Sequence, residues 1–324
     1  MELVRMSAKT ELSVIVTYAQ NQRYDNVEEL FYAYKKGLEA TGLAFEMIYV
    51  VEGDMPDVVK SITNLIDQGE KIILIKLSTN FGPATALHAG FDQAAGELIM
   101  TLPEYQQVDE HDIPKMVSTL DGNDMVIARR WPRRDSILNR IQSGIFHFII
   151  RSSTGFKFQD LGCSVRVFKR VVLEKISVYG DQHRFIPLLA HQMGFTVTEL
   201  KVKQANKDVF QRIYPLGVYT RRMLDILSIF FLIKFTRKPL RFFGLIGIFV
   251  FILGVLLGLL LFVQRNYFGM PMADRPLLLI FLLLMIIGVQ LFAVGLIGEI
   301  IIFTHSKDLN QYVIEKIYSS PKKD

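Results

Sequence analysis

The sequence LSVIV at positions 12–16 decides the fold, because a short uncharged run rich in β-branched residues predicts a buried strand. Comparable runs follow at 47–51, 72–77, 98–102 and 125–128, with a further strand expected at 196–203. Stretches with helical spacing separate the runs, among them 27–38, and 83–95 begins with a proline suited to a first helical turn. Strands that alternate with helices predict crossover connections and an α/β domain with a mostly parallel sheet.

The informative polar residues of such a sheet come directly after its strands, because ligands of open α/β sheets bind beyond the carboxyl ends of the strands. In this chain they are Thr17–Gln20, Glu52–Asp54, Ser78–Gly82, Pro103–Gln107 and Arg129–Arg130. The less regular stretch 160–203 begins with a polar turn and continues with a short helical stretch. We interpret it as an extension of the same domain toward the acceptor of a reaction.

The C-terminal part holds two uncharged stretches, Phe242–Gln264 and Pro276–Gly298, each 23 residues long. At about 1.5 Å per residue such a helix covers roughly 35 Å, more than a hydrocarbon core of about 30 Å. These stretches give the 324-residue chain its mean hydropathy of +0.28, so we expect an integral membrane protein with a two-helix hairpin. Three glycines allow close helix contact, and with it a homo-oligomer formed through the anchor: Gly288, Gly295 and Gly298.

The cations predict the orientation of this hairpin. Basic residues gather at 234–241 and at 307–323, whereas the loop at 265–275 holds two, so the positive-inside rule places the globular domain and both termini in the cytosol. Residues 1–11 lack the apolar region of a cleaved signal peptide, and the single cysteine, Cys163, agrees with a reducing compartment. A net charge of +5 gives no reason to expect a nucleic-acid partner.

The segment Tyr214–Lys238 has apolar residues interrupted by cations, which is typical of a helix that lies in the membrane interface. A surface helix that packs on the globular domain fits the same spacing. We expect four parts: the α/β domain at 1–213, an amphipathic juxtamembrane helix at 214–240, the transmembrane hairpin at 241–304 and a cytosolic tail at 305–324.

Six segments carry a resemblance to a known family. They are LSVIVTYAQ at 12–20, VEGD at 51–54, LSTNFG at 77–82, DLGCSVR at 160–166, HRFIP at 183–187 and GE at 298–299. In this order they resemble the membrane-anchored family 2 glycosyltransferases of the GT-A fold, of the polyprenyl-phosphate and dolichyl-phosphate hexose synthase type. The likeness extends over nearly the whole chain. It implies a GT-A domain with a mostly parallel sheet, followed by an interfacial helix and two transmembrane helices.

The resemblance implies a nucleotide-sugar donor, and a UDP-hexose is the donor that we expect. Tyr18 would pack on the base, while Glu52 and Asp54 would accept hydrogen bonds from the uracil or the ribose hydroxyls. Asn80 belongs to the segment with the closest local match and is assigned to the same donor. These residues follow three of the predicted strands and so meet at one edge of the sheet.

A divalent metal, Mg²⁺ or Mn²⁺, is the cofactor that the resemblance implies, because the diphosphate leaving group must be neutralised by hard oxygen ligands. The Asp-X-Asp motif of the family falls on Leu102-Pro103-Glu104, so Glu104 and Gln106 are the expected ligands. The alternative is that Leu102 ends a buried strand and Glu104 is a solvated loop residue.

On the acceptor side, the resemblance implies Asp160 as a base and Arg184 as a second catalytic residue. The phosphate of a polyprenyl phosphate is already anionic, so positioning by guanidinium groups dominates. Three arginines are expected to bind this phosphate: Arg129, Arg166 and Arg212. Arg130 is expected to be an ordinary surface arginine.

Two hypotheses about function follow. The first is a membrane glycosyltransferase that moves a hexose from a nucleotide sugar to polyprenyl phosphate at the cytosolic face. The second rests on three acidic positions of the family pattern that are replaced here, by Gln20, Val51 and Leu102. A chain that keeps the framework without these carboxylates fits a scaffold that binds a partner transferase or a lipid carrier with little or no catalysis.

Overall fold

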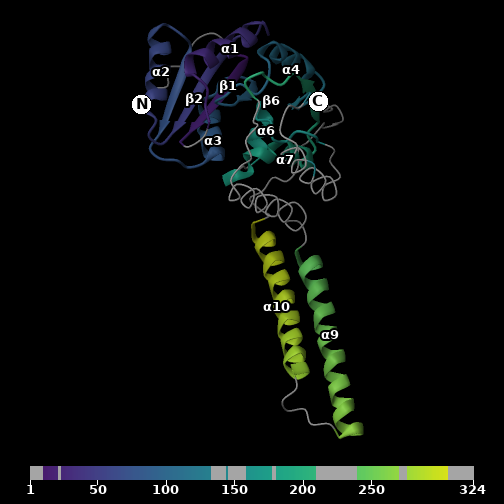
Figure 1. Cartoon of the computed structure of the whole chain (residues 1–324). Helices are drawn as coiled ribbons and strands as arrows, with labels where there is room; N and C mark the ends of the chain where they lie inside the picture. Colours follow the sequence, from purple (N-terminus) through teal and green to yellow (C-terminus); the bar gives the residue numbers. More distant parts are fainter. Residues whose placement is uncertain are drawn as a thin grey trace, which may run out of the picture. The chain divides into compact units, whose positions relative to one another are not determined.

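The computed structural model describes residues 10–20, 23–132, 144, 158–176, 180–208, 239–269 and 276–305. The chain divides into two compact units, one of Met1–Arg221 with Gln311–Asp324 and one of Arg222–Asn310 (Figure 1). Most of the expected juxtamembrane helix at 214–240 lies outside the described residues. The four-part division of the chain therefore stays a prediction.

The first unit is a sheet flanked by helices. Its strands are β1 (Leu12–Ala19), β2 (Phe45–Glu52), β3 (Ile72–Leu77), β4 (Leu98–Leu102), β5 (Met125–Arg130), β6 (Arg166–Lys169) and β7 (Val197–Val202). Its helices are α1 (Val27–Glu39), α2 (Pro56–Asp67), α3 (Pro83–Gln93), α4 (Ile113–Thr119), α6 (Arg170–Lys175) and α7 (Ile186–Gln192), with 3-10 turns η1 (Glu110–Asp112) and η2 (Gly180–Phe185). Among the described residues the strand order is β3-β2-β1-β4-β6-β5-β7.

This sheet confirms the prediction of a mostly parallel α/β domain. Only β6 runs against its neighbours β4 and β5, so the other strands point the same way and their carboxyl ends share one edge. The predicted strands are present, and β3 and β4 have the predicted bounds. The prediction of only a short helical stretch after the polar turn at 160 was incomplete, because β6 comes first and α6 follows it.

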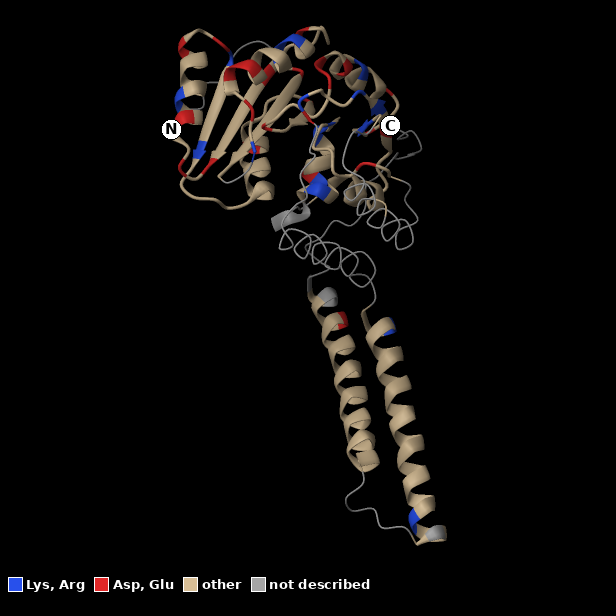
Figure 2. Cartoon of the chain, in the orientation of Figure 1, with Lys and Arg blue, Asp and Glu red and all other residues tan. Residues whose placement is uncertain are grey.

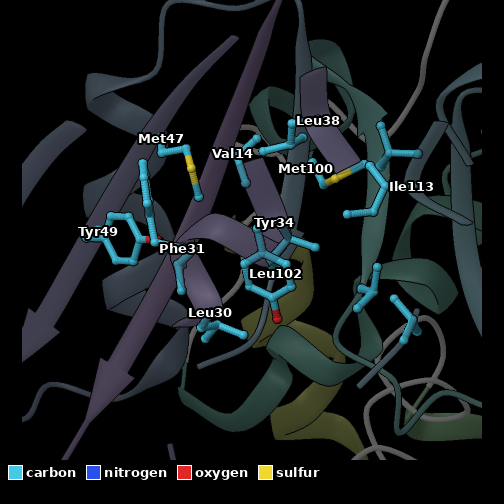
Figure 3. Packing of buried hydrophobic residues seen from close by; sticks show 14 of the residues in the cluster. Val14, Leu30, Phe31, Tyr34, Leu38, Met47, Tyr49, Met100, Leu102 and Ile113 are labelled. Atoms are coloured by element: carbon cyan, nitrogen blue, oxygen red, sulfur yellow. The ribbon is translucent and has the colours of Figure 1, made fainter. Parts of the chain in front are cut away.

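The core of this unit lies between β1, β2, β4 and helix α1 (Figure 3). Val14, Met47 and Met100 pack there as the inward residues of three neighbouring strands. Leu102 is 2% exposed, so it ends a buried strand. The Tyr34 hydroxyl of α1 donates to the carbonyl oxygens of Pro103 at 2.8 Å and Tyr105 at 3.2 Å. The core therefore fixes the loop that follows β4.

The second unit consists of helices α9 (Pro239–Phe268) and α10 (Pro276–His305), which lie side by side (Figure 1). Both are long and apolar enough to cross a membrane, and charged residues are confined to their ends (Figure 2). Glycines of one helix meet the other in reverse order, Gly247 against Gly288 and Gly254 against Met285, so the pair is antiparallel. The predicted hairpin of two apolar helices is present in the structure.

The glycines of α10 are used within the chain. A Cβ atom on Gly288 would lie 2.7 Å from the backbone nitrogen of Phe251, and one on Gly295 would lie 3.0 Å from Cβ of Phe243. Gly298 faces Pro239 in the same way. These glycines therefore allow close contact between α9 and α10 of the same chain. They give no support to the expected homo-oligomer, which stays a prediction.

Gly288→Val is expected to destabilise the hairpin by about 1–3 kcal/mol, because the added atoms meet backbone that cannot give way. The measurement is thermal unfolding of the full chain in detergent. Ala293→Val is the control, because Ala293 lies on the same helix but is exposed. Equal melting temperatures for the two variants would contradict the close approach of the helices.

Candidate active site

Glu104 lies just beyond β4 and is buried, with 9% of its surface exposed. Burial raises the pKa of its carboxyl from 4.5 to about 7, and the neighbouring charge of Arg184 lowers this pKa while that of Asp25 raises it. The alternative expectation of a solvated loop residue at this position was wrong. A carboxylate held out of water, with an exposed arginine near it, is typical of a site that binds a cation or transfers a charged group.

Asp25 is a site residue that the sequence reasoning missed. Its backbone nitrogen donates to the carbonyl oxygen of Glu104 at 3.0 Å, and its Oδ2 accepts from the backbone nitrogen of Gln106 at 3.0 Å. Asn26 caps α1 by accepting from the nitrogens of Glu28 and Glu29, which fixes the backbone next to Asp25. The structure thus joins the loop before α1 to the loop after β4, at the carboxyl edge of the sheet.

The expected role of Gln106 as a second metal ligand stays a prediction. Nε2 of Gln106 donates to Glu110 Oε2 at 2.6 Å, so its amide is turned toward η1. The carboxylate groups of Glu104 and Asp25 offer hard oxygen ligands, which are suited to Mg²⁺ or Mn²⁺. The buried carboxylate fits a divalent cation, because a cation would relieve the cost of holding its charge out of water.

Glu52 ends β2 and is fully buried. Its Oε1 accepts from the backbone nitrogens of Phe81 at 3.0 Å and Gly82 at 2.8 Å, which ties β2 to the loop before α3. Its Oε2 is buried and has no hydrogen-bond partner among the residues that the structure describes. Because an orphaned carboxylate oxygen is costly, this atom is suited to accept from a ligand that binds at the sheet edge.

The other expected donor-binding residues are placed differently. Asn80 is exposed, and its Oδ1 accepts from the nitrogen of Gly82 at 3.1 Å. Asp54 has a side chain that is 84% exposed and lies 4.0 Å from Nζ of Lys76. Tyr18 is fully buried between Tyr24 and Tyr49, so no face of its ring is open to a base in this structure. Glu52 and Asn80 therefore both accept from the backbone nitrogen of Gly82, whereas Tyr18 lies in the core.

Glu52→Gln is expected to raise the KM for a nucleotide-sugar donor about tenfold with little change in kcat, because a donor that hydrogen-bonds to Oε2 would lose one charge-assisted hydrogen bond. The amide oxygen still accepts from Phe81 and Gly82, so the loop keeps its position. The measurement is steady-state transfer with the donor varied. The exposed Asp67→Asn is the control, and an unchanged KM in Glu52→Gln would remove Glu52 from donor binding.

Asp160 is 2% exposed and fully engaged by Arg130. Nε of Arg130 donates to Oδ2 at 2.8 Å, Nη2 donates to Oδ1 at 2.9 Å, and the backbone nitrogen of Arg130 donates to Oδ2 at 3.1 Å. Nη1 of Arg130 donates to Asp208 at 3.0 Å. The expectation that Arg130 is a surface arginine was wrong, because Arg130 is buried. Its partners lie far along the chain, so the sequence alone does not show the pairing. The role of Asp160 as a base stays a prediction.

Arg166 lies in β6 and is 4% exposed. Its Nη1 donates to the carbonyl oxygen of His183 at 2.6 Å and its Nη2 donates to that of Arg184 at 3.1 Å. Burial lowers the pKa of this guanidinium to about 10. In this structure Arg166 therefore holds the backbone of η2, from which the exposed side chain of Arg184 acts on Glu104.

The expected binding of the lipid phosphate by three arginines stays a prediction. Arg129 lies against the ring of Trp131, at 5.3 Å from the ring centroid, and Arg166 is buried beneath η2. Arg212 lies outside the described residues. Among the described candidates on the acceptor side, Arg184 is the one whose charge acts on Glu104.

Comparison with known proteins identifies the family of the chain. The model for glycosyl transferase family 2 matches residues 13–177, which are 165 of the 324 residues. The chain belongs to this family, and it is a glycosyltransferase with the GT-A fold. The matched range includes Glu52, Glu104 and Asp160.

Two relatives indicate the branch of the family. The undecaprenyl-phosphate 4-deoxy-4-formamido-L-arabinose transferase of Photorhabdus laumondii is 32% identical over 283 residues, which are 86% of this chain and 86% of that protein. The dodecaprenyl-phosphate galacturonate synthase of Rhizobium johnstonii is 28% identical over 282 residues, 85% of this chain and 83% of that protein. Both alignments extend well beyond the 13–177 match, so the chain is similar to whole polyprenyl-phosphate sugar transferases.

Solved structures support the fold. The mannosyl-3-phosphoglycerate synthase of Rubrobacter xylanophilus has a TM-score of 0.51 at 11% identity, and covers 68% of this chain and 74% of that one. The glucosyl-3-phosphoglycerate synthase of Mycobacterium tuberculosis, solved with Mn²⁺, UDP and phosphoglyceric acid, has a TM-score of 0.50 at 16% identity, with 68% and 78% covered. At these identities the likeness concerns the fold alone.

Proposed function

We propose that this glycosyltransferase transfers a sugar from a nucleotide-sugar donor to a polyprenyl phosphate at the cytosolic face of a membrane. The observation that carries the proposal is the buried carboxylate of Glu104 at the carboxyl edge of the sheet, with Asp25 and Arg184 acting on it. The two apolar helices suit an acceptor whose tail stays in lipid. Relatives that are 28–32% identical act, by their names, on undecaprenyl and dodecaprenyl phosphate.

Each residue of the edge has a role in this proposal. Glu52 accepts from the nucleotide through its orphaned Oε2. Glu104, with Asp25, would hold a Mg²⁺ or Mn²⁺ ion, which neutralises the diphosphate leaving group when bound. Arg184 orients the phosphate of the acceptor, whose anionic oxygen needs little help from a base. The mechanism therefore depends on positioning and charge more than on proton transfer.

The identity of the sugar is the finer part of the proposal. We infer a UDP-hexose from the resemblance described above. The names of the two relatives specify different sugars, 4-deoxy-4-formamido-L-arabinose and galacturonate, so pentose and uronic acid donors belong in the same test. The solved relatives of this fold that bind UDP are too distant to choose a donor for this chain.

The test is a donor screen with the full chain in nanodiscs, polyprenyl phosphate as acceptor and mass spectrometry of the lipid-linked product. The expected result is a product with one donor class, dependent on Mg²⁺ or Mn²⁺. If no donor gives product while Leu102→Asp restores turnover, the chain is a degenerate member of the family. Calorimetry with UDP and Mn²⁺ then tests the scaffold hypothesis, which has less support because the relatives are named as transferases.

A further inference from the structure

Trp131 directly follows β5 and is the only tryptophan of the chain. Its side chain is 55% exposed although its backbone is fixed, because its nitrogen donates to the carbonyl oxygen of Val202 at 2.8 Å. Arg129 lies 5.3 Å and Nζ of Lys201 lies 5.9 Å from the centroid of the ring. A large amphipathic ring is therefore held at the surface with a cation from each of two strands.

The two cations come from paired positions, because Arg129 of β5 is the register partner of Lys201 of β7. Among the described residues, neither of them lies within ion-pair distance of a carboxylate. Glu199 feels the charge of Arg129, but its Oε1 accepts from the backbone nitrogens of Gln159 and Asp160. As far as the described residues go, the positive charge around Trp131 is open to solvent or to an anionic partner.

An indole ring flanked by cations has the chemistry of a membrane interface. Tryptophan prefers the headgroup level, where its apolar body and its N–H group are both satisfied. Lysine and arginine near an anionic leaflet each add about 1 kcal/mol of attraction. A bilayer is also always at hand, because the same chain carries α9 and α10, so docking of the first unit is an intrachain event with a high effective concentration.

We propose that Trp131, Arg129 and Lys201 form a docking patch for the anionic headgroups of the bilayer. The patch stands at the carboxyl ends of β5 and β7, which is the edge of the sheet that also carries Glu52 and Glu104. Docking would hold this edge at the level of the lipid phosphates. It assigns Arg129 to the bilayer rather than to the phosphate of the acceptor, and it does not depend on the identity of the donor.

The test uses the fluorescence of Trp131, which reports from one place because no other tryptophan is present. The full chain is placed in lipid vesicles, which add no second protein, at a high ratio of lipid to chain, with phosphatidylglycerol or with phosphatidylcholine, each with normal or brominated acyl chains. In phosphatidylglycerol we expect a blue-shifted emission and a loss of roughly half of the intensity with brominated chains, since the ring lies at the acyl boundary. In phosphatidylcholine we expect much weaker quenching.

A matched pair of variants tests the charge. Lys201→Gln is expected to weaken the docked state about fivefold in phosphatidylglycerol, and added salt should do the same. Lys36→Gln is the control with the same change of charge, because Lys36 is exposed on α1, away from Trp131. Circular dichroism confirms that both variants are folded.

Three results would overturn the proposal. The first is emission at the wavelength of a water-exposed indole with no quenching in any lipid. The second is a blue shift without quenching by brominated chains, which indicates a protein partner rather than lipid. The third is quenching that is equal in the two lipids and unchanged in Lys201→Gln, because the cations would then have no part in docking.

Discussion

Glu104→Gln is expected to lower sugar transfer on the order of 100-fold at saturating donor and acceptor, because it removes the buried charge that would hold the metal at the diphosphate. The loss should appear in kcat, since a metal held by Glu104 would act most strongly on the leaving group in the transition state. The measurement is single-turnover transfer in nanodiscs with Mg²⁺ or Mn²⁺. Unchanged transfer with either metal would remove Glu104 from the mechanism.

The same substitution is expected to stabilise the fold at neutral pH. Burial raises the pKa of Glu104 from 4.5 to about 7, so the folded chain binds this proton more tightly than the unfolded chain does. This contribution to stability is complete below about pH 4.5 and is lost as the pH rises through about 7. Gln stays neutral, so Glu104→Gln should be more stable than the wild type by on the order of 2 kcal/mol at pH 8 and should lack this pH dependence.

Glu97→Gln is the matched control for both effects. Glu97 directly precedes β4 as Glu104 follows it, but its side chain is exposed at the opposite edge of the sheet. Transfer and the pH dependence of the melting temperature should both be as in the wild type. A rise in stability in Glu97→Gln equal to that in Glu104→Gln would show that general charge, and not burial of Glu104, is the cause.

The central strands β1, β2 and β4 were predictable because each is a short apolar run that is largely buried, and such runs are distinctive in a sequence. β6 was missed because its residues, Arg166–Lys169, are few and half of them are cationic. Its place between β4 and β5 depends on pairing with strands that are distant in the sequence. The two apolar helices were predictable from length and composition, but the use of Gly288 within the pair was not, since a glycine does not reveal which helix it will meet.

The site was predictable where a carboxylate lies at or just beyond the carboxyl end of a strand, as Glu52 and Glu104 do. Asp25 was missed because it lies six positions beyond Ala19, and its approach to Glu104 depends on backbone contacts between two loops. The arginines show the same limit. The sequence does not show that Arg130 and Arg166 are buried, because only the fold brings their partners near.

Asp160→Asn is expected to destabilise the first unit by about 3 kcal/mol, because it leaves the guanidinium of Arg130 buried without its main counter-charge. The measurement is thermal unfolding of the full chain beside transfer activity. If Asp160 acted as a base and did not stabilise the fold, Asp160→Asn would instead lose activity with an unchanged melting temperature. Asp124→Asn is the control, since Asp124 pairs with Lys169 at a more exposed site.

The double variant Arg130→Met with Asp160→Leu separates the two roles of Asp160. Apolar side chains of similar length remove the charges of Arg130 and Asp160, but buried Asp208 also loses its cation and keeps Gln204 as a neutral donor at 3.0 Å, so part of the lost stability should return. We expect measurable transfer to return with it, because an acceptor that is already a phosphate anion needs no strong base. A double variant that regains its stability but transfers no sugar would show that Asp160 itself is required for the chemistry.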